Sequence, residues 1–130
     1  MSKVDTIFKE LLKFVPQLDL KLVVGPRSQF PKNRDYAACS PIGVIMIAPR
    51  MEQASNDRIT AVLMHEIGHA LDFEYSHKDL EEACGALPKT PERKADAIAE
   101  AIFGVKMYYD IDLVQSLRSG LRPRPTHLGL

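Results

Sequence analysis

The first fifteen residues show the recurrence of apolar positions that is typical of an amphipathic α-helix. These positions are spaced by three or four residues: Val4, Ile7, Phe8, Leu11, Leu12 and Val15. Pro16 should end this helix, because proline lacks a backbone donor and its ring clashes with the preceding turn. We expect the helix to cover one face of a sheet.

Three short apolar segments follow, and each has the composition of a β-strand. Residues 20–24 are rich in leucine and valine and are closed by a Gly-Pro pair. After a polar loop, residues 36–40 and 43–48 form two further segments, and a proline closes the second. Together these segments predict a small sheet of about three strands, placed directly before the next helix.

Helical spacing then returns in three segments, so the pattern as a whole predicts an α+β fold. The first of these helices should span residues 55–75, beginning at a serine and carrying apolar residues all around its axis, which indicates burial. Ser76 opens a short helix that Gly85 ends. Thr90 is the expected N-cap of the last helix, because Pro91 then occupies the first helical position, where proline is favoured.

Length and composition limit the classes of function. The chain has 130 residues, enough for one domain with a single core. Its 17 Lys and Arg balance its 17 Asp and Glu, so bulk charge gives no support to nucleic-acid binding. No apolar run approaches a membrane span and the N-terminus lacks the apolar core of a signal peptide, so we expect a cytoplasmic protein without a membrane partner. Cys39 and Cys84 are expected to be free thiols.

The buried helix contains the sequence HEIGH at residues 65–69, which matches His-Glu-x-x-His. Residues four apart lie on one helical face, so His65 and His69 can direct two imidazoles at one zinc ion. Glu66 projects about 100° away around the axis, from where it can act on a water without being a ligand. The alternative is a polar core cluster without metal, but a buried helix should not carry such residues unless something satisfies them.

A catalytic zinc normally takes three protein ligands, so one ligand remains to be found. Six later residues are candidates by residue type: His77, Asp79, Glu81, Glu82, Glu92 and His127. In the last helix Glu92, Asp96 and Glu100 are spaced by four and line one face. The alternative for this acidic row is a solvated face. Its position after the His-Glu-x-x-His motif favours a functional role.

The HEIGH sequence followed by ERKAD at residues 92–96 resembles the gluzincin class of zinc metallopeptidases. The compact size and the Glu-x-x-Ala-Asp run resemble the small ImmA/IrrE-like peptidases, and His-Glu-x-Gly-His-Ala-Leu-Asp is similar to the lethal-factor-like peptidases. The resemblance covers about residues 43–105. It implies a minimal zincin-like domain over residues 1–120, in which a small sheet packs with the His-Glu-x-x-His helix and a third-ligand helix. Residues 121–130 would be a basic, proline-containing surface tail.

By residue, the resemblance implies that His65, His69 and Glu92 bind one zinc ion, with Glu66 as the general base. Asp96 would hydrogen-bond the distal nitrogen of a ligand histidine. Asp72 lies one turn past His69, and either the same supporting role or a local salt bridge would explain it. A tyrosine or histidine that steadies the oxyanion is not assigned by spacing, and five candidates stay open: Tyr75, His77, Tyr108, Tyr109 and His127.

These features predict a zinc-dependent metallopeptidase that hydrolyses peptide bonds of a specific cytoplasmic protein. The alternative is a binding or regulatory module that keeps the zincin fold but no longer cuts, and the intact Glu66 favours the peptidase. A polypeptide substrate could add an extended strand along residues 43–48, if that strand is an edge beside the metal. If residues 43–48 are instead a core strand, they cannot serve in this way.

Overall fold

The computed structural model describes residues 2–25 and 37–104, which form four α-helices and one three-stranded sheet. In chain order the elements are α1 (Lys3–Leu12), β1 (Lys21–Val24), β2 (Ala37–Cys39), β3 (Val44–Ile47), the 3₁₀ helix η2 (Pro49–Gln53), α2 (Asn56–Glu74), α3 (His77–Cys84) and α4 (Pro91–Phe103). The α+β prediction is confirmed, although η2 was not predicted. The tail at 121–130 lies outside the described residues.

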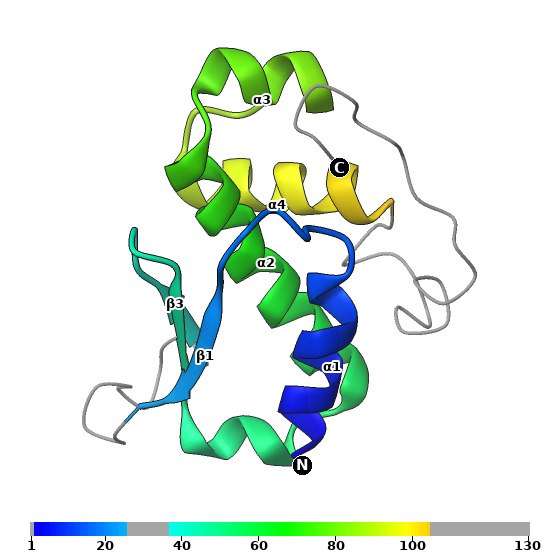
Figure 1. Cartoon of the computed structure of the whole chain (residues 1–130). Helices are drawn as coiled ribbons and strands as arrows, with labels where there is room; N and C mark the ends of the chain where they lie inside the picture. The colour runs from blue at the N-terminus through cyan, green and yellow to red at the C-terminus, as the bar shows by residue number, and fades with distance from the viewer. Residues whose placement is uncertain (1, 26–36, 105–130) are drawn as a thin grey trace.

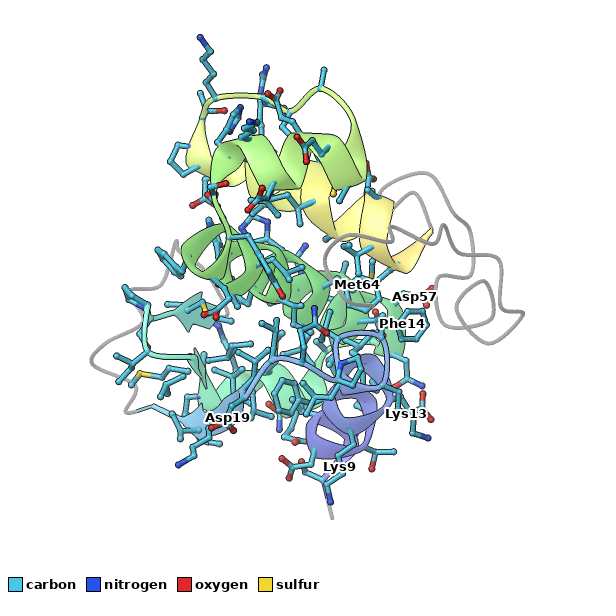
Figure 2. The ribbon with its side chains drawn as sticks, turned by 45° about the horizontal axis from the view of Figure 1, so that its top comes forward. Lys9, Lys13, Phe14, Asp19, Asp57 and Met64 are labelled. Atoms are coloured by element: carbon cyan, nitrogen blue, oxygen red, sulfur yellow. The ribbon has the colours of Figure 1, made fainter. Side chains whose placement is uncertain are left out.

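Helix α2 runs through the middle of the molecule, between the sheet and α1 on one side and α3 and α4 on the other (Figure 1). It packs against α1, β2 and α4. Its fully buried apolar residues are Ile59, Leu63, Met64, Ile67 and Leu71, so the predicted burial of this helix is confirmed. In Figure 2, the exposed Lys9 extends from α1 and the exposed Lys13 from the C-cap that follows it, whereas Met64 lies in the core.

The strand order in the sheet is β1-β3-β2, which makes β3 the central strand. It pairs in parallel with β1, where Lys21 lies opposite Val44, and antiparallel with β2, where Cys39 lies opposite Ile45. Residues 43–48 are therefore a core strand, and their interpretation as an edge strand is wrong. A substrate cannot pair along them, because the backbone groups of β3 are already used on both sides.

The helix ends define where the side chains of α2 and α4 point. The Ser55 side chain accepts a hydrogen bond from Arg58 N, as an N-cap should, and α2 then ends at Glu74. Thr90 stands at the N-cap position of α4 without a side-chain hydrogen bond, and Pro91 follows it as predicted. Glu92 therefore sits in the first turn of α4, where the helix dipole favours a carboxylate.

None of the helices in the described parts of the chain is long and apolar enough to span a membrane. The thiols of Cys39 and Cys84 are both free, as predicted, and both are half-buried.

Candidate metal centre

Three side chains from two helices converge at one point beside α2. His65 and His69 stand one turn apart on α2, and Glu92 reaches them from the first turn of α4. The Nε2 atom of His65 lies 2.7 Å from Glu92 Oε2 and 3.1 Å from His69 Nε2, and His69 Nε2 lies 3.3 Å from Glu92 Oε2. The structure thus brings together the two histidines of the motif and one of the six third-ligand candidates.

The donor set fits a zinc ion. Two imidazole nitrogens and one carboxylate oxygen form one of the recurring ligand sets of catalytic zinc sites. Ligand atoms in a tetrahedron around zinc lie about 3.3–3.6 Å apart, and two of the three observed separations, 3.1 and 3.3 Å, are close to that spacing. The third, between His65 and Glu92, is shorter, and the 75% exposed side chain of Glu92 has room to move outward.

Asp96 lies behind His65, one helical turn beyond Glu92. Its Oδ1 atom is 2.7 Å from Nδ1 of His65, so the ring donates from Nδ1 to the carboxylate. This contact fixes the tautomer in which the Nε2 lone pair is available to a metal. A hydrogen bond between Asp96 and one of the two histidines is what the sequence predicts, and His65 is the histidine that Asp96 contacts.

The charges around the centre move two pKa values in opposite directions. Burial alone would lower the pKa of His65, but the hydrogen bonds to Asp96 and Glu92 and the charges of Glu66 and Asp96 outweigh it and raise that pKa above 6.5. Partial burial would raise the pKa of Glu92, but the neighbouring His65 and His69 outweigh it and lower that pKa. Both shifts favour a charged His65 beside charged carboxylates when no metal is bound.

Glu66 is buried, at 5% exposure, and is not one of the converging ligand atoms. Its charge raises the pKa of His65 on its own helix and, together with the larger effect of burial, raises the pKa of Cys39 on β2 to about 11. The carboxylate therefore lies near both His65 and strand β2, against which α2 packs.

Gly68 allows α4 to approach α2 closely. A Cβ atom at this position would lie 2.9 Å from the carbonyl carbon of Ala95 and would overlap the carbonyl oxygen. The backbones of the two helices touch here, one residue before His69 and three residues after Glu92. The two positions at which the motif allows any residue are thus occupied by the core residue Ile67 and by Gly68, which lets α4 approach.

Asp72 does not join the centre. Its Oδ1 atom lies 2.6 Å from Nζ of Lys94 on α4. Of the two interpretations of Asp72, the structure shows the salt bridge. Its partner lies on another helix, so the salt bridge is not a local one. Lys94 is only 8% exposed, and sequence reasoning missed it because a lysine in an amphipathic helix indicates a solvent-facing position.

The candidates on α3 are not part of the ligand group found among the described residues. The Nε2 atom of His77 lies 3.3 Å from Oε1 of Glu81, one turn along the same helix. Glu81 also accepts a hydrogen bond from Leu87 N. Tyr75, a candidate for oxyanion stabilisation, is half-buried at the end of α2 and packs against the core. The candidates Tyr108, Tyr109 and His127 lie outside the described residues.

No protein-family model matches this chain, and no curated protein and no solved structure shows a significant match to it.

Proposed function

We propose that this protein is a zinc-dependent metallopeptidase with a minimal zincin-like domain and a centre of the gluzincin type. The observation that carries the proposal is that His65, His69 and Glu92 each place one ligand atom within 4.8 Å of the other two. It is supported by the hydrogen bond from His65 to Asp96, since ligand histidines ordinarily donate their second nitrogen to such a partner. The fold class and the burial of α2 are consistent with it.

In this proposal His65, His69 and Glu92 hold the metal. A zinc ion in such a ligand set supplies Lewis-acid activation of a water and of the scissile carbonyl. The Glu66 carboxylate takes the proton from the attacking water and later delivers it to the leaving amine. Its burial suits this role, because a base in a poorly solvated environment is not masked by a hydration shell. Asp96 keeps His65 in the tautomer that leaves Nε2 unprotonated.

The backbone of β2 offers the substrate an edge to pair with. Ser40 N donates to Val44 O, so the groups of Ser40 face β3, and the alternation along a strand turns those of Ala37 and Cys39 away from β3. Among the described residues, β3 is the strand paired with β2. Helix α2 packs against β2, and burial and the charge of Glu66 raise the pKa of Cys39. An extended peptide paired with Ala37 and Cys39 would therefore pass near the base.

Phe73 adds an apolar surface next to the centre. The residue is 50% exposed, and its ring stacks beside the ring of His69, with centroids 6.5 Å apart and planes 25° apart. An exposed aromatic ring in contact with a metal ligand suits a substrate that carries a large apolar side chain near the cleaved bond.

The experiment that tests the proposal compares the zinc-loaded wild type with the Glu66→Gln variant on a peptide library made from a digested proteome. Mass spectrometry would detect new termini. Glu66→Gln is nearly isosteric and removes no ligand, so it should keep fold and zinc while turnover falls by at least about 10²-fold. Zinc-loaded wild type that yields no more new termini than Glu66→Gln would contradict the peptidase and leave the non-cleaving binding module.

A further inference from the structure

Helices α2 and α4 touch through three successive contacts that run in opposite directions along the two helices. His65 of α2 bonds to Asp96, Gly68 meets the backbone of Ala95, and Asp72 pairs with Lys94. Successive contacts lie about one turn apart on α2 but only one residue apart on α4. The residue numbers rise along α2 and fall along α4. The ion pair between Asp72 and Lys94 closes this row at the end away from Asp96.

The middle contact alone does not fix how α4 lies on α2. Helix α4 crosses α2 (Figure 1), and a crossing held at one point of closest approach leaves the angle between the helices adjustable. A contact on each side of the crossing removes that freedom. Glu92 lies in the first turn of α4, so a change in this angle moves its carboxylate relative to His65 and His69.

The burial of Lys94 makes the ion pair a strong constraint. The Lys94 side chain is 11% exposed and that of Asp72 is 24% exposed, while the two charged atoms lie 2.6 Å apart. A buried ammonium needs a partner, because leaving it unpaired in the interior is costly. The first turn of α4 can therefore move away from α2 only if the Lys94 ammonium loses its partner in the interior or moves into solvent.

We propose that Asp72 and Lys94 are positioning residues, which hold the first turn of α4 on α2 and so set Glu92 at the point where it meets the two histidines. Neither residue touches the ligand atoms. The role rests on the metal centre of the proposed function, but the contact itself exists in the protein without a metal. Its effects on α4 can therefore be measured separately from zinc binding.

Lys94→Met distinguishes positioning from a charge effect. Removing a positive charge near a cation site should tighten zinc binding if charge alone matters. Loss of the constraint should instead weaken zinc binding by about tenfold, which is comparable to the smallest effects of losing a group that orients a ligand directly. Methionine suits the buried path of the lysine stem, and Asp72 keeps enough exposure to be solvated, so this variant should fold.

The experiment measures zinc dissociation constants by chelator competition for wild type, Lys94→Met, Asp72→Asn and the exchanged double variant Asp72→Lys/Lys94→Asp. The single variants should bind about tenfold more weakly, and the exchanged variant should recover part of the loss. Ile102→Val is the matched control, because it loosens the buried far end of α4 and should bind zinc like wild type. Lys94→Met binding as tightly as wild type, or Ile102→Val binding as weakly as Lys94→Met, would overturn the proposal.

Hydrogen exchange on the metal-free proteins separates this inference from the proposed function. Amides in the first turns of α4 should exchange faster in Lys94→Met than in wild type, while those around Ile102 should not. If wild type binds no zinc, the metal centre fails, and faster exchange still upholds the constraint on α4. In Lys94→Met, unchanged exchange at residues 94–96, whose amides are the first in α4 with a helical hydrogen bond, would overturn the positioning role whatever the zinc data show.

Discussion

The backbone of Ala95 on α4 occupies the place that a Cβ atom on Gly68 of α2 would take. The helices are therefore in contact at the centre of the candidate site, and any side chain at residue 68 must push α4 away. Because Glu92 and Asp96 belong to α4, their distances from the histidines depend on this glycine.

Gly68→Ala should therefore destabilise the protein by about 1–3 kcal/mol, as overpacking does. On an open helix surface the same exchange would stabilise by about 0.5–1 kcal/mol, so the sign alone identifies the contact. Urea unfolding of the metal-free variant gives this energy, and a zinc titration should show weaker binding. A variant as stable as wild type would mean that the two helices are not in contact at this residue.

Asp96→Asn should weaken zinc binding about 10–100-fold without abolishing it, because the amide no longer accepts the His65 proton as a carboxylate does. Glu100→Gln is the control from the same acidic row, since Glu100 does not belong to the group of converging residues His65, His69 and Glu92. Chelator competition measures both constants. Equal affinities for the two variants would remove Asp96 from the metal centre.

The stability of the metal-free protein should depend on the protonation of His65. Because the folded-state pKa of His65 is raised above 6.5, its pairing with Asp96 stabilises fully below pH 6.5 and is lost as the pH rises through the folded value. The free energy of unfolding should thus fall as the pH is raised above 6.5. Asp96→Asn should show a shallower fall in urea unfolding across the same range, and an equal slope would contradict the assignment.

The local part of the site could be predicted from sequence, because its information lies within one helix. The four-residue spacing of His65 and His69 and the intervening Glu66 follow from helical geometry once the helix is recognised. Glu92 was one of six candidates by residue type, and the resemblance to gluzincins selected it. The structure brings that candidate to the two histidines.

The parts that sequence did not reveal depend on contacts between distant elements. The pattern of residues 43–48 does not determine the strand order. Its apolar density favours at least partial burial, but the pattern leaves both an edge and a core position open. Nor does the sequence around Lys94 show that its ammonium meets Asp72 on another helix. Gly68 occupies a position at which the motif allows any residue. The requirement for glycine there becomes visible only when α4 is placed against α2.

Phe73 should contribute to the binding of apolar groups near the metal. A phenylpropanoyl hydroxamate should bind the zinc-loaded protein more tightly than acetohydroxamate, and Phe73→Ala should reduce this difference while leaving acetohydroxamate unaffected. Val24→Ala is the control, because Val24 is also exposed but lies on β1, at the other edge of the sheet from β2. If Phe73→Ala leaves the difference unchanged, the ring does not contact the ligand.

A calorimetric zinc titration tests the central claim most directly. Wild type should bind one zinc ion per chain, His65→Ala, His69→Ala and Glu92→Ala should lose tight binding, and Glu66→Gln should retain it. This result would assign three residues as ligands and Glu66 as a residue that acts beside the metal. Substoichiometric zinc in the wild type, with no rise in melting temperature when zinc is added, would contradict the account.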